Sequence, residues 1–360
     1  MNDIEFRSLV IPTSLESTDA ADFTAMTEVR NAVYREVNGN EDDTATPAEL
    51  LPHYQPSPDE LRFVWLILAD GVPVGRIGVD IPLEEDSRVA YWLIEILASH
   101  NGRGIGTAAY DIVERAAREH GRSVLQSWVT HPERGPARSD DRLAPPTGFG
   151  TIPRDHRARF YLRHGYSLEQ VERKSVLALP VDSARIEEML GIARTGSYSV
   201  VQWMLPTPPE FVDGYARMKN RMSTDVPAGA LEFDEEDWDA DRVARHDDEW
   251  LGGGKIMLVT AAKCDGTGEL VGYTELSIGN DRTAVTSQED TLVLREHRGN
   301  KIGQLIKCAG LLSWRDIAPE SPKLVTYNAE ENRFMLDVNE AMGFVPDAYV
   351  GAWKKTIDLA

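Results

Sequence analysis

Apolar residues in the first half of the chain follow the spacing of a helix in some stretches and that of a strand in others. Residues 19–37 carry apolar side chains three and four positions apart, which predicts an amphipathic helix. Two apolar runs, 63–69 and 72–81, flank the dipeptide Asp70-Gly71 and predict a β-hairpin with a tight turn. The run at 88–98 predicts the next strand. This alternation of strands and helices is typical of an α/β fold.

The same order of elements recurs in the second half. For the rest of the first half, the pattern predicts strands at 5–10, 123–129 and 166–179, helices at 47–54, 107–120 and 154–164, and a partly helical joint over 185–192. For the second half, it predicts strands at 198–205, 255–263, 269–278, 284–294 and 323–328, helices at 209–221, 235–250, 302–318 and 332–341, and further strands at the C-terminus. A chain of 360 residues is long for one hydrophobic core. We therefore predict two α/β domains, 1–180 and 198–360, joined by a linker at 181–197.

One stretch of the first half combines a strand, a glycine-rich turn and a helix. Tyr91–Ala98 is an apolar run, Ser99–Gly106 is the polar turn, and helical spacing begins at Thr107. Glycine lets the backbone approach a ligand closely, and the free amides and dipole of a helix N-terminus favour an anion. This stretch therefore predicts a phosphate-binding site.

The second half contains a copy of this stretch. Residues 292–304 again run from an apolar strand through a polar turn into a helix, with Arg298 early in the turn and Gly303 at its end. Each copy is followed by a helical segment that closes on a glycine–aromatic pair, Gly165-Tyr166 in the first half and Gly343-Phe344 in the second. The repetition indicates that both halves are built on the same plan.

Two families place glycines in this way. Gly104, Gly106 and Ala109 match the G-x-G-x-x-A string of Rossmann dinucleotide-binding folds. That string normally lies in an opening βαβ unit, whereas here it follows a hairpin, and the strand at 124–129 ends without an acidic residue for a ribose. A dinucleotide site and a turn with a purely structural role stay open as alternatives.

Asn101–Gly106 more closely resembles the pyrophosphate loop of the GNAT acetyltransferases, (Gln/Arg)-x-x-Gly-x-(Gly/Ala), with Asn101 where the family prefers Gln or Arg. The second copy has Arg298 in the first position and Gly303 in the last. The resemblance covers nearly the whole chain as two tandem copies, a layout similar to that of mycothiol synthase and related tandem acetyltransferases. It implies two tandem GNAT domains and an acetyl-CoA-dependent N-acetyltransferase that transfers acetyl directly to the amine of a small molecule.

The resemblance also implies which residues hold coenzyme A. These residues belong to the two strand ends, the two turns and the later motif of the second half: Ile96, Leu97, Gly102, Arg103, Gly104, Ile105, Gly106, Thr107, Val293, Leu294, Arg298, Gly299, Lys301, Ile302, Gly303, Gln304 and Asn332. Lys301 stands where the first copy has Gly104, and it can pair with a phosphate. Coenzyme A binding therefore stays an expectation for both halves.

The catalytic residues that the resemblance implies lie in the first half. Tyr161, four residues before Gly165, matches the tyrosine that protonates the departing thiolate, whereas Asn339 has that place in the second half. Glu95, the only carboxylate in the strand that precedes the first turn, is the candidate base if the strand register turns it to the cleft, and an edge-facing or paired carboxylate is the alternative. Weaker candidates for the base are Glu289, Asp290 and His131.

Composition narrows the range of partners. The net charge of −21 argues against nucleic acid or an anionic membrane as the main partner. It suits a cationic acceptor such as an amine, and the alternative is that it serves solubility alone. The two cysteines and the lack of a long apolar segment predict a cytoplasmic protein without structural metal. We expect a monomer or homodimer that acts on a small molecule. The segment at 131–151 makes the first copy longer than the second and predicts either a lid over the acceptor site or a surface insertion. The rival function is a non-catalytic coenzyme A-binding regulatory or scaffolding protein.

Overall fold

The computed structural model describes residues 3–132 and 141–359. Contacts between residues divide the chain into two compact units. Unit 1 contains residues 1–172, 228–232 and 348–360, and unit 2 contains residues 173–227 and 233–347. The C-terminal segment thus belongs to the same unit as the N-terminal half. The domain bounds 1–180 and 198–360, with a linker at 181–197, describe the two sequence repeats and stay a prediction.

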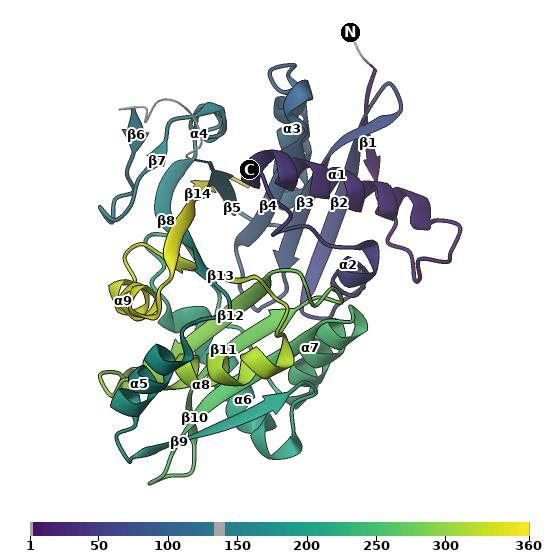
Figure 1. Ribbon diagram of the computed structural model, residues 1–360. Helices are drawn as coiled ribbons and strands as arrows, with labels where there is room; N and C mark the ends of the chain where they lie inside the picture. Colours follow the sequence, from purple (N-terminus) through teal and green to yellow (C-terminus); the bar gives the residue numbers. More distant parts are fainter. Residues whose placement is uncertain (1–2, 133–140, 360) are drawn as a thin grey trace. The chain divides into compact units, whose positions relative to one another are not determined.

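The sheet of unit 1 has the strand order β1–β2–β3–β4–β5–β14 (Figure 1). Its strands are β1 (Ile4–Ser8), β2 (Glu60–Ala69), β3 (Val72–Pro82), β4 (Val89–Ile96), β5 (Val124–His131) and β14 (Val345–Thr356). Neighbouring strands are antiparallel except β4 and β5, which are parallel. Residues 349–356 of β14 pair with β5 along its whole length, so the end of the chain supplies a strand of this sheet.

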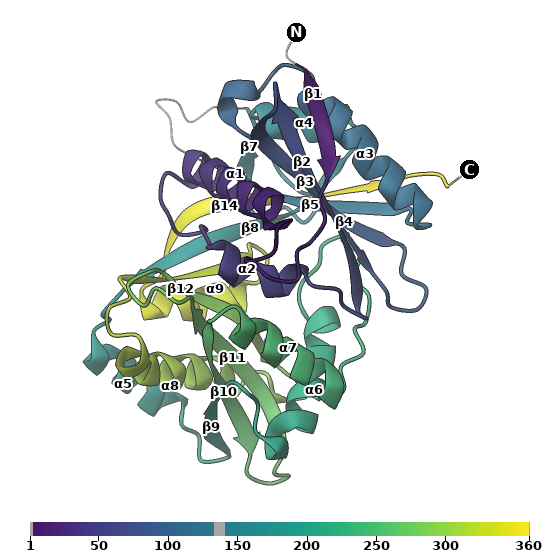
Figure 2. The ribbon, with the colours of Figure 1, turned by 90° about the vertical axis from the view of Figure 1, so that its right-hand side faces the viewer.

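Helices cover both faces of the unit 1 sheet (Figure 2). Helix α1 (Ala20–Asn38) packs Phe23 and Met26 against Leu66 of β2, and α2 (Pro47–Tyr54) adds to the same cluster. Helices α3 (Ile105–Glu119) and α4 (His156–Arg163) belong to the cluster that contains Ile67. Successive residues of a strand point to opposite faces, so α1 and α3 lie on opposite sides.

Unit 2 repeats this plan with the strand order β8–β13–β12–β11–β10–β9. Its strands are β9 (Tyr198–Met204), β10 (Ile256–Cys264), β11 (Leu270–Ile278), β12 (Thr286–Val293), β13 (Lys323–Ala329) and the second part of β8 (Ser167–Ala178). Helices α6 (Pro209–Asp225) and α7 (Ala240–Gly252) pack with Met257 and Val259. Helices α5 (Ser183–Ala193) and α8 (Ile302–Ile317) pack with Leu258, and α9 (Arg333–Met342) adds Met342 to that cluster.

The mixed α/β architecture predicted from the sequence is confirmed, and most elements begin within a few residues of their predicted positions. The chain forms one continuous strand, β8, within 166–179, and the C-terminal strands are likewise a single strand, β14. Two short paired strands, β6 (Arg142–Leu143) and β7 (Ile152–Pro153), lie in and beside the segment at 131–151, of which residues 133–140 are outside the described part. In the described part of the chain, every helix is too short or too polar to cross a membrane.

Candidate active site

No side chain caps the N-terminus of α3 at the first turn, although the Phe160 and Ile96 side chains lie beside Gly106. A 3-10 helix at Ala98–His100 follows β4, and Gly102 and Gly104 both adopt the left-handed conformation, with φ of 74° and 82°. Gly104 is the N-cap of α3, and no side chain hydrogen bonds to the first-turn amides as a cap. A Cβ added at Gly102 or Gly104 would meet no atom within 4 Å. The amides of Ile105–Thr107 are therefore open to an anion.

The second turn has the same geometry with one substitution. Gly299 and Lys301 are left-handed, with φ of 84° and 58°, and Lys301 is the N-cap of α8, again without a side-chain cap. A residue with a Cβ in this conformation costs about 1 kcal/mol. The exposed Lys301 ammonium forms no ion pair with any residue in 3–132 or 141–359. The unpaired lysine and the strain both suit a group that meets a phosphate.

Most other polar residues predicted to hold coenzyme A have partners within their own unit. Arg103 donates to the carbonyl of Ser99 at 2.9 Å, and Arg298 donates to the carbonyl of Val293 at 3.0 Å. Gln304 donates to the carbonyl of Met189 at 2.7 Å, and Asn332 caps α9. Arg103 and Arg298 thus brace the two turns, and each guanidinium has further N–H groups that can reach a ligand.

Strands β4 and β5 are hydrogen-bonded only where they begin. Their parallel pairing covers residues 89–91 and 124–126, although β4 continues to Ile96 and β5 to His131. In unit 2, β12 and β13 pair only at residues 286–287 and 324–325. Backbone groups of β4 after Tyr91, including those next to Ile96 and Leu97, therefore lack a ladder partner on β5. An extended, amide-bearing chain can pair with them as a further strand would.

Tyr161 lies on α4 in the aromatic part of the unit 1 core. Its ring stacks on Trp353 of β14 with centroids 4.9 Å apart and lies 5.3 Å from the Trp92 ring. Its hydroxyl shares a hydrogen bond of 2.7 Å with the Ser127 hydroxyl of β5. Burial raises the pKa of Tyr161, and the hydrogen bond with Ser127 opposes that rise. The phenol therefore keeps its proton at neutral pH and can donate it.

Glu95 is not a free carboxylate. Its Oε2 accepts from Nε of the buried Arg76 at 2.6 Å, and Arg76 also donates to the Tyr54 hydroxyl at 2.8 Å. Burial alone would raise the pKa of Glu95, but the guanidinium of Arg76 outweighs burial and holds that pKa below its usual value. A carboxylate with a lowered pKa accepts a proton weakly, so the pairing reduces the strength of Glu95 as a base.

His131, at the end of β5, is positioned by a carboxylate. Its Nδ1 lies 3.1 Å from Oδ2 of Asp155, and this contact orients the imidazole ring. Nε2 is buried and has no hydrogen-bond partner among the described residues, and the same holds for Nε1 of Trp353. A Cβ at Gly351 would lie 3.1 Å from His131 Nε2 and 2.9 Å from Trp353 Nε1, so both nitrogens face this glycine.

The sequence analysis named His131 but missed its partner. Asp155 caps α4 by accepting from the Ala158 amide at 2.9 Å, and the same carboxylate contacts His131. An aspartate directly before a helical segment is the usual N-cap signal, which could have identified Asp155 as the start of α4. Its contact with His131 depends on the packing of α4 beside β5, which no local pattern contains.

In unit 2, the corresponding carboxylates are already paired. Asp290 accepts from Lys219 at 2.8 Å and from the Tyr273 hydroxyl at 3.0 Å, and Glu289 accepts from Ser277 at 2.7 Å. Lys219 also contacts Glu275 at 2.9 Å. Among the residues that the structure describes, no group of three or more His, Cys, Asp or Glu side chains could hold a metal ion.

Residues 24–139 match the Acetyltransferase (GNAT) family. The whole chain is similar in fold to a tandem GNAT protein from the clavulanic acid biosynthesis pathway, solved without acetyl-CoA, at 23% identity and a TM-score of 0.72 with 98% of both chains covered. It is also similar to a GCN5-related N-acetyltransferase from Sphaerobacter thermophilus, at 14% identity and a TM-score of 0.60, over 98% of this chain and 95% of that one. A third match is a GCN5-related glucosamine N-acetyltransferase region in a fungal multi-domain GH3 β-N-acetylglucosaminidase, at 14% identity and a TM-score of 0.61, over 99% of this chain and 38% of that one. No curated protein matches the chain in sequence.

The uncapped helix N-termini after β4 and β12 thus lie within a fold that the chain shares with tandem GNAT proteins. The chain has the fold of a tandem GNAT protein, and the match to the GNAT family covers residues 24–139, within the N-terminal half. The resemblance stated from the sequence is thereby confirmed, and the Rossmann alternative is set aside.

Proposed function

We propose that this protein is an acetyl-CoA-dependent N-acetyltransferase that acts on a small amine in unit 1. The observation that carries the proposal is the open turn between β4 and α3, where two left-handed glycines leave the amides of Ile105–Thr107 uncovered. These amides suit the pyrophosphate of coenzyme A. The unpaired edge of β4 suits its amide-bearing arm, which can add to the sheet beside Ile96 and Leu97.

Two proton transfers accompany the reaction, and a different residue of unit 1 carries out each. Acetyl-CoA supplies an activated acetyl group, and an amine that attacks it must lose a proton while the sulfur gains one. Tyr161, neutral and hydrogen-bonded to Ser127, donates the proton to sulfur. The His131 lone pair, held in place by Asp155, accepts the proton of the amine. Glu95 remains ionised against Arg76, and the buried pair holds β3 and β4 together beside the site.

Replacing His131 with glutamine should lower kcat by about a hundredfold, the lower end of what a general base contributes. Glutamine keeps a polar group of similar size but has no lone pair of comparable basicity. Glu95→Gln should lower kcat by less than His131→Gln does. Its main effect should be a smaller free energy of unfolding, because the buried Arg76 charge loses its carboxylate partner. Steady-state rates and melting curves of both variants separate the two roles. A Glu95→Gln enzyme that is slow and fully stable, beside an active His131→Gln enzyme, would reverse the assignment.

The second turn should bind coenzyme A through Lys301 and the amides of Ile302–Gln304. Lys301→Gly removes the charge and also the strain of a left-handed lysine, so it should stabilise unit 2 by about 1 kcal/mol while weakening this site about tenfold. Lys301→Arg keeps the charge and is the matched control. Calorimetric titration should give two coenzyme A molecules per wild-type chain. One molecule per chain, bound equally well by Lys301→Gly, would show that the second turn has only a structural role.

Identification of the product tests the function directly. The purified protein is incubated with acetyl-CoA and a panel of small primary, secondary and polycationic amines, and the products are identified by mass spectrometry. We expect an acetamide of at least one amine, with cationic amines preferred because the chain carries a net charge of −21. Tight binding of coenzyme A without any acetylated amine would favour the rival function, a regulatory or scaffolding protein.

A further inference from the structure

Helix α4 lies beside the first turn and carries several cations. The Nε2 atom of His156 lies 3.5 Å from Nδ2 of Asn101, and a Cβ at Gly106 would lie 3.3 Å from the Phe160 ring. Side chains three and four residues apart lie on the same side of a helix, so the cations on this side of α4 are those that follow His156 at these intervals. All three are exposed, and we call them the α4 cations: His156, Arg159 and Arg163.

In the part of the chain that the structure describes, the α4 cations form no ion pairs. The Arg159 guanidinium donates to the carbonyl of Arg154, just before α4, at 2.8 Å, and its remaining N–H groups can reach a ligand. Partial desolvation and the charges of Arg157 and Arg159 lower the pKa of His156. The positive field of α4 therefore reaches the edge of the first turn, in a chain whose net charge is −21.

The turn itself adds a further cation. Arg103 is exposed, and its guanidinium donates to the carbonyl of Ser99 at 2.9 Å. Next to it in the chain, the uncapped amides of Ile105–Thr107 and the dipole of α3 favour a first phosphate. The α4 cations can hold a second phosphate beside it, because arginine recognises this group with two parallel N–H donors.

The repeat shows that the fold does not require these cations. Counted back from the glycine that follows each helix, the α4 cations correspond to Phe334, Asp337 and Ala341 of α9. The first residue of α9, Arg333, donates to Asp337 at 2.6 Å and is therefore already paired. Unit 2 thus has an apolar side chain, a carboxylate and a methyl group where α4 has three cations.

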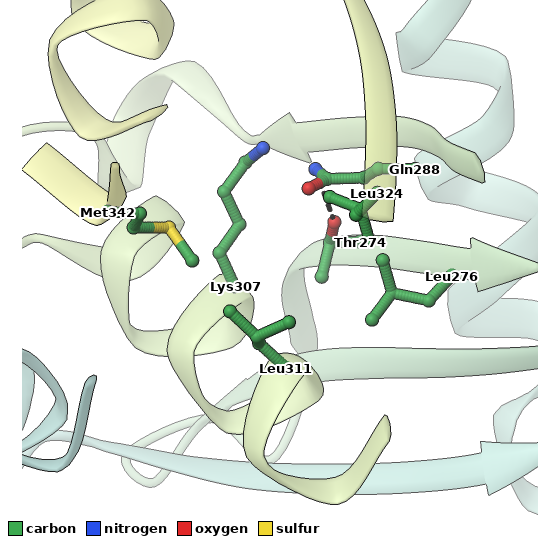
Figure 3. A pocket seen from close by; sticks show the side chains of 7 residues that line it. All are labelled: Thr274, Leu276, Gln288, Lys307, Leu311, Leu324 and Met342. Atoms are coloured by element: carbon green, nitrogen blue, oxygen red, sulfur yellow. Dashed lines mark hydrogen bonds between the residues drawn. The ribbon is translucent and has the colours of Figure 1, made fainter. Parts of the chain in front are cut away.

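The lysine of α8 that faces α9 does not replace them. Figure 3 shows the Lys307 side chain extending from α8 between Met342 of α9 and the strands that carry Thr274 and Gln288. Lys307 is 3% exposed, and its amine donates to Oδ1 of Asn339 at 2.9 Å. This charge points into the core of unit 2. Beside two turns of the same geometry, only the first therefore has exposed cations on the neighbouring helix.

Coenzyme A carries a phosphomonoester in addition to its pyrophosphate. Both groups are attached to the same ribose, so they bind near one another, and the phosphomonoester carries close to two negative charges at neutral pH. We propose that the α4 cations, together with Arg103, bind this phosphomonoester, so that the first turn distinguishes coenzyme A from dephospho-coenzyme A. This inference rests on the proposed function, which places the pyrophosphate on the amides of the first turn.

Calorimetry with coenzyme A and with dephospho-coenzyme A, which lacks only the phosphomonoester, tests the proposal. The protein is the Lys301→Glu variant, in which the second turn is blocked, so that the first turn alone is measured. Coenzyme A should bind about tenfold more tightly than dephospho-coenzyme A at low salt, because several exposed charges act together. The ratio should shrink as salt is added, since salt screens exposed charges.

A charge reversal in α4 identifies the residues that read the phosphomonoester. Arg159→Asp gives α4 the residue that α9 has at this position, and it should bring the two affinities together, mainly by weakening coenzyme A. Arg115→Asp is the matched control, because it makes the same change of charge at an exposed site near the C-terminal end of α3. It should leave the ratio of the two affinities near its starting value.

The outcomes separate this inference from the proposed function. Equal affinities for the two ligands in the Lys301→Glu protein, or a ratio that Arg159→Asp leaves unchanged, would overturn the inference and leave the proposed function intact. Binding of neither ligand would contradict the proposed function itself. If Arg159→Asp leaves the ratio unchanged but raises KM for an anionic amine, the α4 cations bind the acceptor and the inference is wrong.

Discussion

Replacing Tyr161 with phenylalanine should lower kcat by about a hundred- to ten-thousand-fold, with little change in coenzyme A affinity. The change removes one oxygen atom and keeps the ring that stacks on Trp353 and Trp92, so the aromatic core stays filled. What is lost is the proton that the thiolate takes up. Burial keeps the phenol protonated at neutral pH, so the wild type holds a proton at this position and the phenylalanine variant does not.

Tyr166→Phe is the matched control for Tyr161→Phe. Tyr166 lies in the same aromatic cluster, with its ring 5.4 Å from that of Tyr161, and its hydroxyl accepts from Tyr110 at 3.2 Å. Loss of that hydroxyl removes a buried hydrogen bond of comparable size and should reduce stability by about 1 kcal/mol without a comparable loss of rate. Steady-state kinetics and melting curves of the two variants give the comparison. Equal rates for both would mean that Tyr161 only packs α4.

Replacing Gly104 with glutamate should abolish binding of coenzyme A at the first turn. The new carboxylate would stand over the amides of Ile105–Thr107, where the account places a pyrophosphate, and repel it. Space is not the obstacle, because a Cβ at Gly104 meets no atom within 4 Å. The effect expected from charge is therefore much larger than the roughly 1 kcal/mol that the left-handed conformation adds for any side chain.

The chain provides its own control for this experiment. Lys301 holds the left-handed N-cap position of the second turn, so Gly104→Lys introduces a residue that the same turn already accommodates. Gly104→Lys should fold and bind coenzyme A, while Gly104→Glu should fold and lose binding at the first turn. Calorimetry on both variants separates charge from strain. Unchanged affinity in a folded Gly104→Glu protein would place coenzyme A elsewhere.

The parts of the site that could be predicted from the sequence are those that local chemistry determines. A left-handed turn needs glycine, and a helix shows its apolar face every three or four residues, so the turn around Gly104 and the helix behind it are visible in the sequence. The copy around Gly299 follows from the same pattern. The spacing of Tyr161 to Gly165 predicts that the tyrosine lies on the helix before the glycine, but it does not predict that the ring stacks on Trp353.

The rest of the site depends on contacts between distant segments. Glu95 meets Arg76 because β3 and β4 pair in one particular register, which turns a candidate base into half of an ion pair. Trp353 and Gly351 reach unit 1 because residues 349–356 pair with β5, more than two hundred positions earlier in the chain. Sequence periodicity marks the buried face of a helix but does not show which charge lies within reach of which partner.

The rate of amine-dependent release of coenzyme A from acetyl-CoA, compared between Gly104→Glu and Lys301→Glu, tests the central claim most directly. Gly104→Glu places a carboxylate at the N-cap of α3 in unit 1, and Lys301→Glu places one at the N-cap of α8 in unit 2. The account predicts that the wild type releases one coenzyme A for each acetylated amine, that Gly104→Glu loses most of this activity and that Lys301→Glu keeps most of it. No amine-dependent release by the wild type, or a loss confined to Lys301→Glu, would contradict it.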